Sequence, residues 1–313
     1  MVATAEQLAA LDASHQEQQL KNASGVASLI LAYWALVRKD DIAGTGGEWL
    51  DKSTDAVVAG WRKSIDLSLA YTTTVRRLQA PRAAAPELPR IEIPNRMRDV
   101  SVIANEPRLL VPNYEQIRKS LAYTGLKGAV VGLQKTPQDI KPLAGDDTPM
   151  SPADRNLMDA TNRLLAKRRQ EAFEKAGAAA TGAALRHVFN GGREAVKKAI
   201  KLDARVARGY VRVARIGCCY FCAMLASRGP VYGKDSFDES DPRFLGDEGT
   251  KHKVHDFCRC ALRPVYTSSA MEWPNNSLDY DELWRRSTRD VSGSAKVRKF
   301  RAAYEASLRT TPV

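Results

Sequence analysis

The chain has 313 residues, of which 44% are hydrophobic and 27% charged, and these values exclude collagen-like, low-complexity and wholly disordered proteins. Its 48 Lys and Arg against 36 Asp and Glu give a net charge of +12, which favours an acidic partner such as nucleic acid. No apolar run reaches the 18 or so residues of a membrane-spanning helix. The first residues also lack the basic start of a secretory signal, so we expect a cytosolic protein without membrane contact.

Apolar residues at helical spacing predict two long helices at the start of the chain. The first covers 3–40 and is expected to end at the glycines of 44–47, and the second covers 48–78. Because their connection is short, we expect an antiparallel hairpin arm over residues 1–79. His15 is expected to be exposed on this arm.

Prolines interrupt the next part of the chain, 80–150. Four of them between 81 and 94 exclude a long helix there, so we expect an extended linker with a short strand near 90–93. A shorter helix is predicted over 114–133, followed by a second proline-rich loop.

A basic domain is predicted over 151–270 and a helical tail over 271–313. Ser151 and Pro152 begin a helix that is expected to end near Ala179, resume near Leu185 and resume again after Gly192. Strands are expected near 210–216 and 260–266, with a short helix from Cys219 to Arg228. The fold class is therefore α+β and predominantly α-helical, with a helical N-terminal arm before a compact C-terminal domain that holds a short sheet.

The positive charge is concentrated in one stretch. Residues 151–234 hold 17 Lys and Arg against 6 Asp and Glu, a net of +11. This pattern indicates either a solvated helix face or nonspecific binding of a polyanion such as nucleic acid. The expected phosphate contacts are Arg168, Arg169, Lys197, Lys198, Lys201, Arg205, Arg208, Arg212 and Arg215.

All five cysteines lie between 218 and 260, in the segments Cys218-Cys219-Tyr-Phe-Cys222 and His255-Asp-Phe-Cys258-Arg-Cys260. A Cys-x-x-Cys pair followed by a second pair is typical of a structural zinc site. The expected zinc ligands are Cys219, Cys222, Cys258 and either His255 or Cys260, with Cys218 as the spare. Disulfide bonds, a reactive catalytic cysteine and inert thiols remain as alternatives.

These segments resemble minor head proteins of tailed phages. The pattern comprises Arg212-Val-Ala-Arg215, the stretch from Cys219 to Tyr232, and the segment from His255 to Cys260, and it covers about 210–266. It is most similar to the MuF-like group in actinobacteriophages, many of which are labelled capsid maturation proteases. The resemblance implies a low-copy head protein that is assembled in the host cytoplasm and retained in the virion. Its implied partners are the portal protein and the major capsid or scaffold protein. The basic stretch would then face packaged double-stranded DNA, without sequence specificity, or a negatively charged scaffold protein.

A protease site is less evident from the residues themselves. The chain has neither His-Glu-x-x-His nor Gly-x-Ser-x-Gly. The best candidate nucleophile is Ser227, with His255 as base beside Asp256, although Ser227 also fits an ordinary helix end. A Cys222–His255 dyad is conceivable only without a metal.

Two alternatives to a protease stay open. One is a structural, zinc-binding head protein that docks onto a portal or capsid subunit through the faces of Trp34 and Trp61. The other is a nonspecific DNA-binding zinc protein.

Overall fold

The computed structural model describes residues 4–84, 87–92, 108–137, 139, 141, 150–215, 217–230, 258–267 and 273–310. The described residues are mostly helical, with two short two-stranded sheets, which confirms the predicted fold class. The chain divides into two compact units. Unit 1 comprises Met1–Val26, Val57–Asn113 and Leu185–Val313, and unit 2 comprises Ala27–Ala56 and Tyr114–Ala184. The predicted division into four segments stays a prediction.

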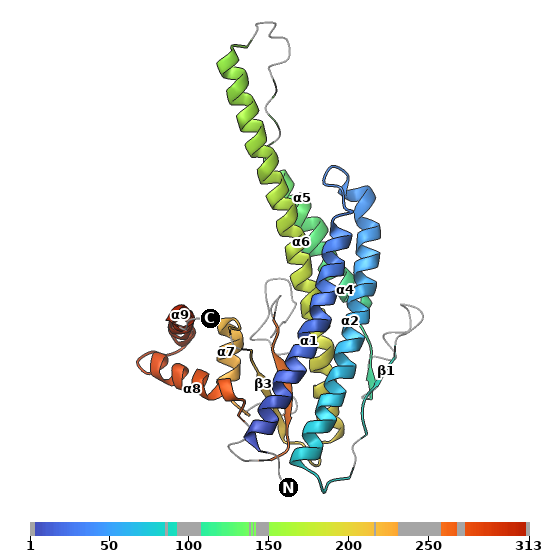
Figure 1. The fold of residues 1–313 in the computed structure, drawn as a ribbon, viewed down its shortest axis with the longest axis vertical. Coiled ribbons are helices and arrows are strands. Elements are labelled where there is room, and N and C mark those ends of the chain that lie inside the picture. The colour runs from blue at the N-terminus through green and yellow to red at the C-terminus, as the bar shows by residue number, and fades with distance from the viewer. Residues whose placement is uncertain are drawn as a thin grey trace. The chain divides into compact units, whose positions relative to one another are not determined.

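The predicted hairpin is formed by α1 (Ala5–Trp34) and α2 (Ile42–Gln79), which run antiparallel in Figure 1. Within unit 1, Asn22 Nδ2 donates to Gly60 O at 2.8 Å and Gln19 Nε2 donates to Ser64 O at 2.9 Å. The prediction that glycines 44–47 end the first helix is wrong. They lie in the first turns of α2, where the Asp41 carboxylate accepts the Gly44 N–H at 3.0 Å.

His15 lies inside unit 1 rather than on the surface. Its side chain is stacked on Tyr71, with ring centroids 4.1 Å apart, and its Nε2 lies 3.2 Å from Ser68 Oγ. Only 4% of the residue is exposed, so the predicted exposure of His15 is wrong. Burial lowers its pKa to about 4, because the charged imidazolium loses its hydration.

The third long helix, α6 (Pro152–Leu202), is continuous. Its predicted start is confirmed, since Ser151 Oγ accepts the Asp154 N–H at 3.1 Å. The predicted interruptions are wrong. A Cβ on Gly191 would lie 2.6 Å from Trp61 O, and one on Gly192 would lie 2.5 Å from Ser68 Oγ. These glycines therefore let α6 approach α2 closely within unit 1, and they do not end the helix.

Unit 2 packs around Trp34. Its ring centroid lies 4.7 Å from that of Phe173 and 4.9 Å from that of Trp49. Trp34 is 5% exposed, and Trp61, in the core of unit 1, is 3% exposed. Both tryptophan rings are thus buried, so neither is exposed for the expected docking contact.

The predicted helix over 114–133 is confirmed, with one irregularity. It is built from α4 (Tyr114–Leu121), a π-helical turn η2 (Ala122–Lys127) and α5 (Gly128–Gln134). A Cβ on Gly125, within the π turn, would lie 2.7 Å from the Trp49 ring. The turn therefore brings its backbone directly against the aromatic core of unit 2.

Two short sheets and the tail complete unit 1. Strand β1 (Arg90–Ile91) pairs in parallel with β2 (Leu109–Leu110), and β3 (Gly209–Val213) pairs antiparallel with β4 (Ala261–Val265). Helix α7 (Tyr220–Ala226) follows β3. The tail helices α8 (Asn275–Thr288) and α9 (Ser294–Thr310) pack on α7 through an apolar cluster that includes Met224, Phe300 and Tyr304.

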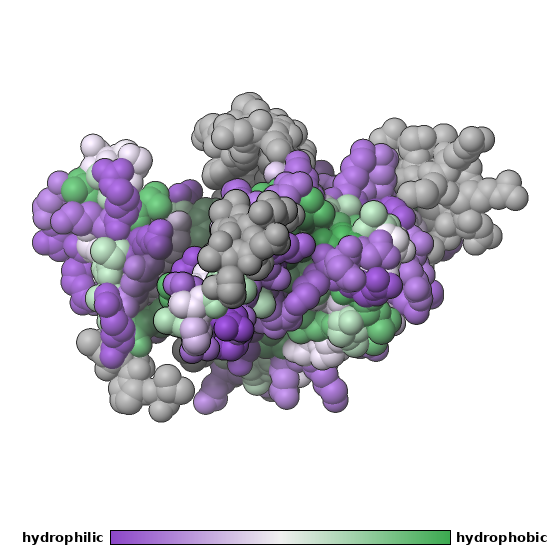
Figure 2. Space-filling model, turned by 90° about the horizontal axis from the view of Figure 1, so that it is seen from above, coloured by the Kyte–Doolittle hydropathy of each residue, from purple (hydrophilic) through white to green (hydrophobic). Residues whose placement is uncertain are grey.

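In the described part of the chain, no helix has an apolar stretch that would be long enough to cross a membrane. The face drawn in Figure 2 is mainly hydrophilic, shown in purple, with smaller hydrophobic areas in green between the polar residues.

Candidate metal centre

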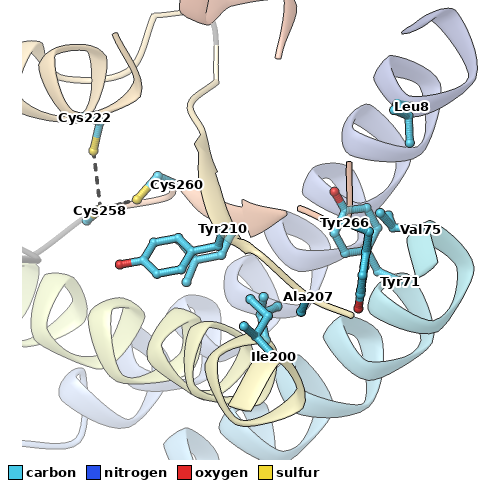
Figure 3. Packing of buried hydrophobic residues seen from close by; sticks show 12 residues of the cluster. Leu8, Tyr71, Val75, Ile200, Ala207, Tyr210, Cys222, Cys258, Cys260 and Tyr266 are labelled. Carbon is cyan, nitrogen blue, oxygen red and sulfur yellow. Dashed lines mark hydrogen bonds between the residues drawn. The ribbon is translucent and has the colours of Figure 1, made fainter. Parts of the chain in front are cut away.

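Three cysteines meet where β3, α7 and β4 converge in unit 1. We call Cys222, Cys258 and Cys260 the Cys cluster. Cys222 belongs to α7, and the other two directly precede β4. The β3–β4 register pairs Val213 with Ala261, so the residues before β4 lie at the end of β3, close to the start of α7. Figure 3 shows the resulting arrangement, in which Cys222 faces the Cys258–Cys260 segment.

The geometry of the Cys cluster suits a metal ion. The Sγ atoms of Cys222 and Cys258 are 3.4 Å apart, and those of Cys258 and Cys260 are 3.3 Å apart. All three thiols are free and buried, and their sulfurs lie within 4.8 Å of one another. A tetrahedral site with metal–sulfur bonds near 2.3 Å places its sulfurs about 3.8 Å apart, close to the observed spacing. The Cys cluster can therefore bind a metal that prefers sulfur.

The remaining expected ligands lie around the Cys cluster or outside the described residues. Cys219 caps α7 and is exposed, and its Sγ accepts the Cys222 N–H at 3.4 Å. Cys218 contacts tyrosines of the tail instead, with its Sγ 3.6 Å from the Tyr304 hydroxyl. His255 falls in the part of the chain that the structure leaves undescribed. The structure thus brings together three of the five expected ligands, with Cys219 beside them.

Sequence reasoning missed Arg193 of α6, which is only 2% exposed. Its guanidinium donates from Nε to Cys260 O and from Nη2 to Cys258 O, both at 3.0 Å. The same Nη2 lies 3.3 Å from Cys258 Sγ and 3.8 Å from Cys260 Sγ. No local motif marks Arg193, because its partners lie 65 and 67 residues away along the chain.

A second guanidinium reaches the Cys cluster from β3. The sequence predicts that Arg212 contacts phosphate, but it is 2% exposed, and its Nη1 lies 3.2 Å from Cys260 Sγ. It is therefore directed at a sulfur inside unit 1 and is not available to a phosphate outside it. Strand β3 places it there because Arg212 pairs across the sheet with Leu262, two residues after Cys260.

The surroundings shift the pKa values of Cys222 and Cys260 in opposite directions. Hydrogen bonds from Cys222 and Cys258, aided by the charges of Arg193 and Arg212, lower the pKa of Cys260 well below its usual value. Hydrogen bonds with Cys219, Cys258 and Cys260 raise the pKa of Cys222. Among the three thiols, Cys260 is therefore the one whose anionic form its surroundings favour.

Comparison with protein families adds an independent finding. The family model described as VG15 protein matches residues 114–287, more than half of the chain. The chain belongs to the VG15 protein family. This is a viral family, and the match indicates a phage protein. Comparisons with curated proteins and with solved structures give no match.

The VG15 match includes the candidate nucleophile Ser227. This residue ends α7, is 3% exposed, and donates its hydroxyl to Met224 O at 2.8 Å. Its expected partners His255 and Asp256 lie outside the described residues. The described geometry is that of an ordinary helix end, in which the hydroxyl satisfies a backbone carbonyl.

All nine basic residues expected to bind phosphate also lie within the VG15 match. In unit 2, Arg168 is exposed, whereas Arg169 forms an ion pair with Asp139. In unit 1, α6 places three lysines around one cavity of about 390 Å³ next to Leu109 and Leu110, and Lys198 donates to Leu109 O. These lysines are Lys197, Lys198 and Lys201. The exposed arginines of unit 1 in this set are Arg205, Arg208 and Arg215.

Proposed function

We propose that this VG15-family chain is a minor head protein that acts in phage head morphogenesis. The observation that supports this role most strongly is the family match over 114–287, since that range contains the whole 210–266 pattern that resembles MuF-like proteins. On this proposal the protein associates with the portal and with the major capsid or scaffold protein in the host cytoplasm, and it stays in the virion.

The proposed role of the Cys cluster is to bind a structural zinc ion. Zinc suits a set of buried thiols, because thiolates are its common ligands in closed structural sites. A fourth protein ligand would complete the tetrahedron and leave no open position for water, so the ion would stabilise the domain without activating a nucleophile. The free energy of metal binding would then contribute to the folding of unit 1.

A minor head protein could be purely structural or could also be a serine protease. The structural role is better supported. A serine nucleophile must pass its proton to a base and must be open to substrate. Ser227 is buried, and its hydroxyl proton is directed at Met224 O. Proteolysis by Ser227, His255 and Asp256 therefore stays a second candidate that rests on the resemblance alone.

The test is co-expression of the chain with the portal, scaffold and major capsid proteins of its phage, followed by sedimentation and mass spectrometry of the particles. We expect the chain at low copy in the procapsids. We also expect Ser227→Ala to leave both its incorporation and the cleavage pattern of the other proteins unchanged. Absence of the chain from procapsids and virions would contradict the head role. Cleavage that is abolished in a folded, metal-loaded Ser227→Ala protein would establish the protease instead.

A further inference from the structure

The described part of the chain buries four arginine side chains, and their partners differ in kind. Arg76 pairs with Asp203, and Arg263 pairs with Asp12 at 2.8 Å. Both are thus neutralised by buried carboxylates. The other two are Arg193 and Arg212, which contact the Cys cluster.

The charge of Arg193 has no carboxylate among its partners in the described residues. Its Nη1 donates to Asn190 Oδ1 at 2.7 Å, and its other nitrogens donate to the carbonyls of Cys258 and Cys260. These partners satisfy the N–H groups but leave the positive charge unbalanced. Beyond these partners, Nη2 lies 3.3 Å from Cys258 Sγ and 3.8 Å from Cys260 Sγ, so the guanidinium faces the sulfurs of two proposed metal ligands.

Arg212 adds a second charge from another element. It approaches Cys260 Sγ from β3, whereas Arg193 approaches from α6. Two guanidinium groups thus converge on sulfurs that lie only 3.3 Å apart. Thiolates bound to a divalent cation keep part of their negative charge, so both guanidinium groups face the side of a metal–thiolate centre on which that charge would lie.

We propose that Arg193, together with Arg212, is a positioning and charge-balancing residue of a metal–thiolate centre formed on the Cys cluster. The inference rests on the proposed metal site. Arg193 has two tasks in it. It holds the carbonyls of Cys258 and Cys260, so that both sulfurs face Cys222, and it offsets the negative charge that the thiolates keep after the cation binds. Such outer contacts typically orient ligands and tune metal affinity.

The test compares two buried arginines in the full-length protein. Arg193→Met removes the charge at the Cys cluster, and Arg263→Met removes a similarly buried charge that pairs with Asp12. Zinc affinity is measured by competition with a chromophoric chelator, and the shift in melting temperature on zinc addition is measured in parallel. We expect zinc affinity to fall by roughly 10–100-fold in Arg193→Met. Arg263→Met should lower the melting temperature but keep the wild-type zinc affinity and zinc-dependent shift.

Each outcome separates this inference from the metal site itself. If the wild-type protein binds no zinc, the metal site and the inference both fall. If the wild-type protein binds zinc and Arg193→Met binds it equally well, the metal site stands and the inference falls. Should Arg193→Met not fold, Arg193→Lys decides, since it keeps the charge but loses the forked contact to both carbonyls. Weaker zinc binding by Arg193→Lys supports the positioning task, and wild-type affinity overturns it.

Discussion

The charges around the Cys cluster predict its fourth ligand. A zinc ion with four thiolates carries two negative charges, whereas three thiolates and a neutral histidine leave only one. The guanidinium groups of Arg193 and Arg212 beside the Cys cluster favour the more negative ligand set. Cys219→Ser should therefore weaken zinc binding, and Cys218→Ser should not, because the Cys218 sulfur contacts Tyr304. Zinc retained after dialysis against a chelator measures the effect. The opposite result, zinc released from His255→Ala but kept in Cys219→Ser, would contradict this assignment.

His15 should make unit 1 sensitive to acid. Burial lowers its folded-state pKa from 6.5 to about 4, so the unfolded chain binds an extra proton between these values and stability falls as the pH falls through this window. The loss on going from pH 7 to pH 4 should be about 3 kcal/mol for this group. Urea titrations of the wild-type protein and His15→Gln at both pH values test this. Between pH 7 and pH 4, the free energy of unfolding of His15→Gln should fall by about 3 kcal/mol less than that of the wild-type protein. An equal fall in both proteins would refute the assignment of this pKa shift to His15.

At the residue scale, the sequence predicts the cysteines of the metal site but not the two arginines that contact them. Spacing alone brings Cys222 and Cys258 into one candidate site, because paired cysteines are a local signal. Arg193 carries no such signal. The basic stretch predicts a phosphate contact for Arg212, whereas the burial of Arg212 depends on the pairing of β3 with a strand about 50 residues later. Charge along the chain does not distinguish a buried arginine from an exposed one.

At the scale of elements, the close contact of α6 with α2 predicts opposite effects for two helical glycines. Gly191→Ala should destabilise the protein by roughly 1–3 kcal/mol, because the new Cβ would lie 2.6 Å from Trp61 O. Gly25→Ala in α1 meets open space and should stabilise by about 0.5–1 kcal/mol. Urea midpoints give both values. Equal effects at the two sites would mean that α6 does not pack on α2 as described.

The sequence predicts helices and strands correctly where an apolar periodic pattern extends over many residues. It does not predict the residues at which these elements end. The hairpin, the start of α6 and the strands β3 and β4 follow from periodicity and capping residues. The predicted breaks at glycines 44–47 and 191–192 are wrong, since a glycine signals a helix end and a close helix contact equally well. The π turn at 122–127 depends on packing against Trp49, which no local pattern reveals.

At the scale of the whole molecule, the net charge of +11 over 151–234 predicts salt-sensitive, sequence-independent binding of duplex DNA. Reversing three exposed residues of unit 1 to Glu, Lys201, Arg205 and Arg208, should flatten the log–log salt dependence, by about 0.9 for each phosphate that the variant no longer neutralises. The matched control reverses three exposed residues of the tail helices, Arg286, Lys299 and Arg309. Equal slopes for the two triple variants would leave the basic stretch as a solvated surface.

We propose above all that the buried thiols of this phage protein hold a metal ion. Zinc-edge X-ray absorption of the purified full-length chain, together with elemental analysis, tests it most directly. We predict about one zinc ion per chain, with metal–sulfur distances near 2.3 Å and a shell of mainly sulfur ligands. A protein without zinc, whose Cys222, Cys258 and Cys260 are found in disulfide bonds or as unreacted thiols, would contradict it.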